Sequence, residues 1–135
     1  MSALLDSIKR HEGYRSRVYK DSLGIDTIGY GFAIKDLVLS ETVSTIILSE
    51  KIATLTAEVH EKFSWLKNKP DHIQDVVIEM CYQLGVTGVS RFKNTLKAMQ
   101  DERWDDAADG MLSSLWARQT PSRAKELSEI VRKTV

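Results

Sequence analysis

Residues 11–32 read HEGYRSRVYKDSLGIDTIGYGF, and this stretch decides the fold. It contains two short runs of β-forming residues, Val18-Tyr19 and Thr27-Ile28-Gly29-Tyr30-Gly31-Phe32. Between them, Asp21-Ser22-Leu23-Gly24 has Asp first and Gly last, which is typical of a tight turn. The stretch therefore predicts a small β-hairpin with Asp21 in its turn and Thr27 opening its second strand.

A helix is predicted immediately before the hairpin, from Ala3 to Glu12. Leu4, Leu5 and Ile8 share one of its faces, and Gly13 stands where helices commonly end. Glu12 follows Ile8 by four residues, so it continues this apolar stripe at the negative end of the helix dipole. The ionised form of a carboxyl group is disfavoured there, which makes Glu12 a conspicuous residue.

Helical periodicity dominates the rest of the chain. A long amphipathic helix ending near Pro70 is predicted from apolar residues spaced three or four apart: Leu48, Ile52, Leu55, Val59, Phe63 and Leu66. Asp71 is expected to cap a second helix that ends at Gly85, and an apolar face makes this the central helix: Ile73, Val76, Val77, Met80, Cys81 and Leu84. Shorter helices are predicted over Phe92–Met99, over Trp104–Leu115 and from Pro121 to the C-terminus, with Thr120 as N-cap.

These elements predict an α+β, predominantly α fold with a small β-hairpin lobe and a helical body. The 135 residues contain no repeat and no low-complexity linker, so a single domain over residues 1–135 is expected. Within it, we assign approximately residues 13–60 to the small lobe and the start of the connecting helix. Residues 1–12 and 61–135 are assigned to the helical body.

Charge and cysteine content exclude several classes of protein. The 19 basic side chains balance 19 acidic ones, whereas dedicated nucleic-acid binders usually carry a net basic surface. Cys81 is the only cysteine, so an internal disulfide and a Cys-based zinc site are ruled out, and Cys81 itself is interpreted as a small buried hydrophobe. No apolar run reaches the roughly 18 residues of a membrane span, and no basic segment precedes the first apolar residues as in a signal peptide. We expect synthesis in a cytoplasm and no stable membrane association.

Glu12, Asp21 and Thr27 combine the groups that glycoside hydrolysis needs. That reaction uses a general acid kept protonated by an apolar setting and a second group that orients water on the other face of the sugar. Simple structural roles compete with this interpretation. Glu12 could be a solvated helix-end residue, Asp21 a turn former and Thr27 a β-branched strand residue.

The spacing of these three residues resembles the Glu-x8-Asp-x5-Thr signature of the phage lysozymes, glycoside hydrolase family 24. A second region of the chain resembles the same family in order and spacing: Tyr82-Gln83-Leu84-Gly85-Val86-Thr87-Gly88-Val89, Phe92, Asn94, Leu96, Arg103-Trp104-Asp105, Ala107-Ala108, Trp116, Gln119-Thr120-Pro121 and Arg123-Ala124. The resemblance covers nearly the whole chain and implies a lysozyme-like fold.

The activity implied by the resemblance is hydrolysis of the β-1,4 bond between N-acetylmuramic acid and N-acetylglucosamine in bacterial peptidoglycan. Glu12 would be the general acid, Asp21 would stabilise positive charge on the sugar and help position water, and Thr27 would hold that water. The family implies inversion, for which the two carboxyl groups should stand about 6.5–9.5 Å apart. No cofactor or metal is required, a monomer is expected, and the enzyme would act on the cell wall in the periplasm.

The resemblance also implies residues that bind the substrate. Tyr82, Gln83, Thr95 and Gln119 match positions lining the sugar cleft, and Arg123 matches an arginine that approaches the acid. Two positions of the hairpin lobe, Gly31 and Ala33, complete the predicted set.

Three departures from the family pattern limit this transfer. Phe32 stands where the family usually has histidine, the stretch between Gly31 and Gln83 is shortened, and Gly110 replaces a side chain that contacts sugar. Two alternatives therefore stay open. One is a non-catalytic peptidoglycan-binding or phage structural module with the same fold, since a fold alone does not prove activity. The other is a small helical nucleic-acid-binding protein, which would not explain the spacing of the three residues.

Overall fold

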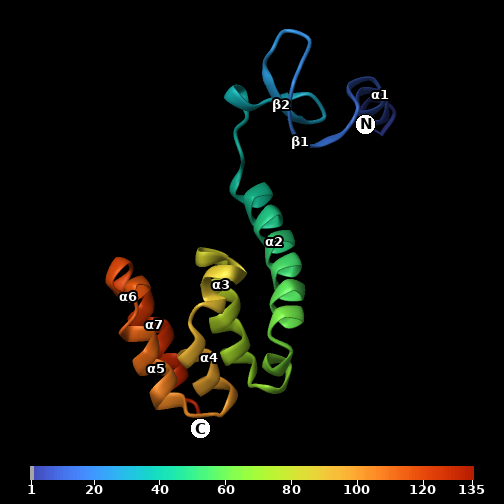
Figure 1. Cartoon of the computed structure of the whole chain (residues 1–135). Coiled ribbons are helices and arrows are strands. Elements are labelled where there is room, and N and C mark those ends of the chain that lie inside the picture. Colours follow the sequence, from blue (N-terminus) through green and yellow to red (C-terminus); the bar gives the residue numbers. More distant parts are fainter. Residues whose placement is uncertain (1) are drawn as a thin grey trace. The chain divides into compact units, whose positions relative to one another are not determined.

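The computed structural model describes residues 2–135, and the chain divides into two compact units, Met1–Thr45 and Ile46–Val135. The boundary falls inside the long helix α2, Glu41–Lys62. Figure 1 labels the helices and strands in chain order.

The first unit combines helix α1, Ser2–Glu12, with a three-stranded antiparallel sheet in the order β1-β2-β3. Strand β1 covers Arg15–Lys20, β2 covers Asp26–Gly29, β3 covers Phe32–Ala33, and the 3-10 helix η1 covers Ile34–Asp36. The predicted hairpin is confirmed as β1 and β2, in which Tyr19 pairs with Thr27. The third strand was not predicted. The helix prediction before the hairpin is also confirmed, and the Gly13 N–H ends α1 by donating to the Lys9 carbonyl at 2.9 Å.

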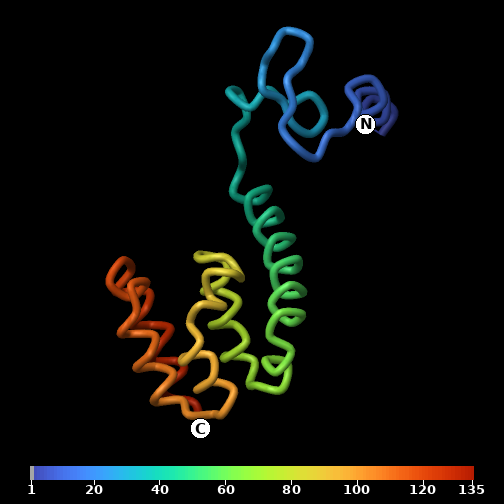
Figure 2. Tube along the Cα trace, in the orientation of Figure 1, coloured from blue at the N-terminus to red at the C-terminus, as the bar shows by residue number. Residues whose placement is uncertain are grey.

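The second unit buries the hydrophobic core. Beyond α2 it contains η2 (Ser64–Asn68), α3 (Asp71–Ser90), α4 (Lys93–Gln100), α5 (Trp104–Leu112), α6 (Leu115–Gln119) and α7 (Pro121–Arg132). Helix α5 packs against both α4 and α7, as the Cα trace in Figure 2 shows. The largest fully buried side chains come from η2 and from α2, α3, α4, α5 and α7: Leu66, Ile73, Met80, Met99, Met111, Val59, Val76, Val77, Val89 and Val131. Together the two units make an α+β, predominantly α fold, as predicted.

The central helix was predicted largely correctly. All six residues of its expected apolar face lie in the core or against it. At Gly85 the backbone leaves helical geometry, with φ 80° and ψ 157°, and a further helical segment continues to Ser90. A side chain is strained at such a positive φ, so glycine suits the break. The capping prediction was wrong, because Pro70 occupies the N-cap position and Asp71 is already helical.

Other predicted helix boundaries shift by several residues. The long helix begins earlier than predicted and gives way after Lys62 to η2. The helix predicted over Trp104–Leu115 is two helices, because the Ser114 hydroxyl accepts the Ala117 N–H at 3.2 Å and starts α6 there. Thr120 occupies the N-cap position of α7 as predicted, but its hydroxyl donates to the Trp116 carbonyl instead of capping the helix.

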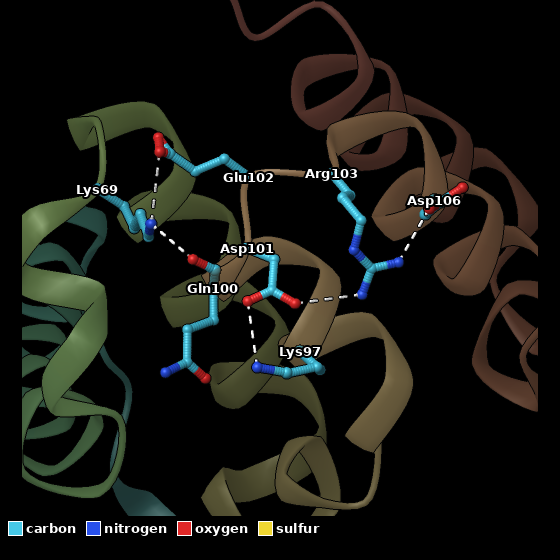
Figure 3. Close-up of polar contacts among 7 residues, drawn as sticks. All are labelled: Lys69, Lys97, Gln100, Asp101, Glu102, Arg103 and Asp106. Atoms are coloured by element: carbon cyan, nitrogen blue, oxygen red, sulfur yellow. Dashed lines mark hydrogen bonds and ion pairs between the residues drawn. The ribbon is translucent and has the colours of Figure 1, made fainter.

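A polar cluster fixes the turn between α4 and α5 (Figure 3). Asp101 accepts a hydrogen bond from Lys97 at 3.1 Å and lies 3.5 Å from Arg103. The hydrogen bond from Lys97 and, to a smaller extent, the interaction with Arg103 favour the ionised carboxylate, so the pKa of Asp101 is lowered. Lys69 donates to the Gln100 carbonyl at 2.9 Å, which ties this turn to the end of η2.

Cys81 is buried on α3, 1% exposed, as the interpretation of it as a small hydrophobe required. The pKa of the Cys81 thiol is raised to about 11, mainly by burial and to a smaller extent by the negative charge of Glu58. Across residues 2–135, no helix combines the length and the apolar character needed to cross a bilayer.

Candidate active site

Asp21 and Thr27 are both held by the backbone of Ile25. The Ile25 N–H donates to Asp21 Oδ1 at 2.9 Å, and the Leu23 N–H donates to the same oxygen at 2.8 Å. The Ile25 carbonyl accepts the Thr27 hydroxyl at 2.8 Å and the Asp21 N–H at 3.0 Å. One peptide segment therefore fixes the two side chains with respect to each other.

These hydrogen bonds leave defined acceptor groups unused. Thr27 is 3% exposed, and its hydroxyl spends its only proton on Ile25, so its remaining lone pairs can only accept. Asp21 receives both backbone N–H groups on Oδ1, and within residues 2–135 its Oδ2 has no hydrogen-bond donor. Two acceptors on one hairpin suit a water molecule that donates both of its protons.

Glu12, the last residue of α1, lies against Gly31. A Cβ built at Gly31 would collide with Glu12 Oε2 and lie 3.1 Å from Glu12 Cδ. Two further contacts reach Tyr30, in the turn between β2 and β3. Lys9 Nζ of α1 lies 5.5 Å from the centre of the Tyr30 ring, and the centres of the Tyr14 and Tyr30 rings are 5.5 Å apart. Glu12 is exposed, so residues 2–45 do not supply the apolar setting expected of a general acid.

The two predicted substrate residues of the first unit neighbour the predicted catalytic ones. Gly31 contacts Glu12, and Ala33 pairs across the sheet with Thr27. The first unit therefore gathers five of the ten residues predicted for the site. Their catalytic and binding roles stay predictions.

In the second unit, Thr95 and Gln119 border one cavity of about 620 Å³. Gln83 supports its wall, because Gln83 Oε1 accepts the Trp116 indole N–H at 2.9 Å. The Trp116 ring meets the Phe92 ring edge to face, with centres 6.2 Å apart. An aromatic wall with nearby amide and hydroxyl groups is suited to a sugar or a peptide.

Tyr82 and Arg123 do not border this cavity. Tyr82 is half exposed and borders two other cavities, both of them between α2 and α3. Arg123 lies in the first turn of α7, at the positive end of the helix dipole, and its Nε donates to Glu79 of α3 at 2.8 Å. The predicted approach of Arg123 to Glu12 stays a prediction.

Sequence reasoning missed Ile25 and much of the cavity. Ile25 acts through its peptide groups, which no side-chain pattern reveals. Arg91 and Lys93, the cationic members of the cavity lining, are not among the residues predicted for the site. Their positions immediately before and at the start of α4, beside Phe92, were the available signal.

The chain matches the family model for phage lysozyme over residues 9–133. It therefore belongs to the phage lysozyme family and is a lysozyme-like glycosidase, a muramidase-like hydrolase of the cell wall. It is 27% identical to probable T4-type lysozyme 1 of Dictyostelium discoideum, over 97% of this chain and 94% of that protein. It is also 27% identical to the pre-baseplate central spike protein Gp5 of Enterobacteria phage T4, over 96% of this chain but 27% of that protein.

The alignments also show a difference in length. The match to probable T4-type lysozyme 1 extends over 161 residues, although this chain has 135. This chain is therefore shorter than that relative, and the shortening of the stretch between Gly31 and Gln83 stays a prediction.

Proposed function

We propose that this protein hydrolyses the β-1,4 bond between N-acetylmuramic acid and N-acetylglucosamine in peptidoglycan. Glu12 serves as the general acid, and Asp21 and Thr27 position the attacking water. The observation that carries the proposal is the common attachment of Asp21 and Thr27 to Ile25, with one acceptor left free on each. The turn and strand roles account for the bonds to Ile25, whereas the free acceptors on Asp21 and Thr27 are the groups that a bound water requires.

The proposed mechanism follows from the available hydrogen-bond acceptors. The water donates one proton to Thr27 Oγ1 and the other to Asp21 Oδ2, which directs an oxygen lone pair at the anomeric carbon. Glu12 gives its proton to the leaving oxygen on the opposite face of the sugar, and Asp21 receives the proton that the water loses. Because water attacks from the face opposite the leaving group, the product has inverted configuration.

The remaining predicted residues belong to the substrate side of this proposal. Tyr82, Gln83, Thr95, Gln119 and Arg123 contact the substrate. Residues 1–135 would then act as one lysozyme domain. We propose a monomer that acts on peptidoglycan in the periplasm.

The experiment measures reducing ends released from purified peptidoglycan by the wild type, by Glu12→Gln and by Glu61→Gln. Glu61 is an exposed glutamate near the end of α2, so its substitution controls for the loss of one carboxylate. We expect Glu12→Gln to abolish cleavage and both variants to unfold at the urea concentration of the wild type. Mass spectrometry then identifies the product ends, and proton NMR identifies the anomer released.

Each outcome distinguishes one class of protein. Hydrated ends of inverted configuration from the wild type, with none from Glu12→Gln, support the proposal. Anhydromuramic ends would indicate a lytic transglycosylase instead. If the wild type binds peptidoglycan and releases no ends, the chain is a binding module with the lysozyme fold. Unfolding of Glu12→Gln alone would assign Glu12 a structural role.

A further inference from the structure

The 620 Å³ cavity of the helical unit differs in charge from its neighbours. Its lining includes Arg91 and Lys93 and no acidic residue. The cavities of 540 and 510 Å³ between α2 and α3 each include at least two carboxylates. Among residues 2–135, neither Arg91 nor Lys93 forms an ion pair. Two unpaired cations at one aromatic-walled cavity favour an anionic group as its ligand.

The start of α4 borders the same cavity and offers backbone N–H groups. Phe92 is its N-cap and has no side-chain acceptor, and the first helical bond runs from the Leu96 N–H to the Phe92 carbonyl at 2.9 Å. The N–H groups of residues 93–95 therefore have no acceptor within α4. Lys93 sits in this first turn, at the positive end of the helix dipole, where a cation is unfavourable without an anion nearby.

Thr95 provides an independent observation. The residue is only 5% exposed, yet its hydroxyl makes no hydrogen bond within the described chain. No enclosed polar side-chain atom of residues 2–135 lacks a partner, so Thr95 Oγ1 must keep some contact with solvent. The residue borders the 620 Å³ cavity and one smaller cavity. Gly110 makes room for it, because a Cβ at Gly110 would collide with Thr95 Oγ1.

An acid does approach Thr95 from the other side. Thr95 also borders a smaller cavity of about 220 Å³ whose lining includes Asp106. Arg103 donates to Asp106 at 2.9 Å, so the charge of that carboxylate is already compensated. The free cations therefore lie on the side of the larger cavity.

We propose that Arg91, Lys93 and Thr95 form a carboxylate-binding subsite that selects substrates by charge. The two cations attract the carboxylate, and the Thr95 hydroxyl and the first N–H groups of α4 donate to its oxygens. This inference rests on the proposed function, because the carboxylate would be a free acid group of the peptide attached to muramic acid. Arg91 and Lys93 are then specificity residues, which distinguish a free acid from its amide.

Binding is tested without catalysis by titrating the full-length protein with N-acetyl-alanyl-glutamic acid and with its diamide. We expect the diacid at millimolar concentration to shift the backbone NMR signals of Lys93, Asn94 and Thr95, and the diamide to leave them unchanged. Inorganic phosphate is the third probe. If phosphate shifts these signals and the diacid does not, or if no probe shifts them, the subsite is not one for peptide carboxylates.

Selectivity is tested with peptidoglycan whose peptide carboxylates are free or have been converted to amides. Charge-assisted hydrogen bonds are strong enough that we expect a preference for the free acid of about tenfold in kcat/KM. The combined variant Arg91→Ala, Lys93→Ala should lose this preference, because kcat/KM for the free acid should fall by about tenfold toward the value for the amide. A variant with two other exposed lysines changed, Lys62→Ala, Lys67→Ala, should keep the preference.

The outcomes separate the two proposals. Wild-type protein that cleaves both polymers equally overturns the subsite and leaves the glycosidase proposal intact. Wild-type protein that cleaves neither polymer overturns the glycosidase proposal, and the peptide titration then judges the anion site alone. Thr95→Val should weaken diacid binding severalfold, and unchanged binding would exclude the hydroxyl as a donor.

Discussion

Substituting Gly31 by alanine should separate the position of Glu12 from the stability of the fold. Gly31 has φ +75°, where an L-residue costs about 1–2 kcal/mol. The new Cβ would also collide with Glu12 Oε2. Because ordinary contact distances are about 3.5 Å, the carboxyl group must move by about 1 Å. Its motion is cheap in stability, since a carboxylate is the flexible end of its side chain.

A displacement of this size is costly for catalysis. Misplacing a reacting group by about 1 Å can lower the rate roughly a hundredfold. We therefore expect Gly31→Ala to lose about 1–2 kcal/mol of the free energy of unfolding and to release reducing ends roughly a hundred times more slowly than the wild type. Urea unfolding and the peptidoglycan assay measure the two effects separately.

Gly24→Ala is the matched control. Gly24 has φ +78°, close to that of Gly31, but a Cβ there meets nothing within 4 Å. Both variants should therefore lose similar stability, and Gly24→Ala should retain most of the activity. Equal activities in the two variants would refute the reasoning, because the position of the Glu12 carboxyl group against Gly31 would then be irrelevant to catalysis.

Three further predictions concern other groups. With a pKa of about 11, roughly one Cys81 thiol in a thousand is ionised at pH 8. The folded protein should therefore not react with a thiol reagent until urea unfolds it. Fast reaction without urea would contradict the burial of Cys81. Lys97 and Arg103 lower the pKa of Asp101 below 3.8, so the folded state binds fewer protons there than the unfolded state. This stabilisation is present above pH 3.8 and is lost as the pH falls through the lowered pKa. The free energy of unfolding of Asp101→Asn, measured by urea titration, should therefore depend less on pH between 5 and 2 than that of the wild type. An unchanged dependence would argue against the pairing of Asp101 with Lys97 and Arg103. Thr27→Val should cost about 1 kcal/mol of stability, because it removes one hydrogen bond. It should also lower turnover roughly a hundredfold, because the water is misplaced. If this variant turns over substrate at the wild-type rate, Thr27 has no part in the mechanism.

The elements predicted correctly are those with strong local signals. Gly13 ends α1, and the Asp21–Gly24 turn joins two strands, because helix termination and tight turns depend on a few adjacent residues. Apolar periodicity located the central helix because its buried face is long and continuous. Strand β3 was missed because two residues carry no periodicity.

Helix boundaries were predicted less well, because apolar periodicity can continue across a break. Leu112, Leu115 and Trp116 keep helical spacing, so the division between α5 and α6 is invisible in the apolar pattern. The hydrogen bond that starts α6 involves Ser114, and serine is common both in loops and in caps. Local competition between a side chain and the backbone decides such a boundary.

The candidate site likewise contains residues that the sequence predicts and residues that it does not predict. Glu12, Asp21 and Thr27 could be selected from sequence because their spacing resembles a family signature, and Gly31 and Ala33 followed from the same resemblance. What fixes Asp21 and Thr27 is the peptide backbone of Ile25, which any residue with an N–H provides. Its identity as isoleucine carries no information about that role.

The cavity of the helical unit depends on residues far apart in the chain. Gln83 reaches Trp116 across 33 positions, and Thr95 meets Gly110 across 15. No local pattern encodes those pairs, because tertiary packing of α3, α4, α5 and α6 brings them together. Gly110 illustrates the consequence: the sequence indicates only a missing sugar contact, whereas the structure shows that the absent side chain leaves room for the Thr95 hydroxyl. The absence of a side chain at Gly110 thus leaves the space that the Thr95 hydroxyl occupies in the proposed carboxylate subsite.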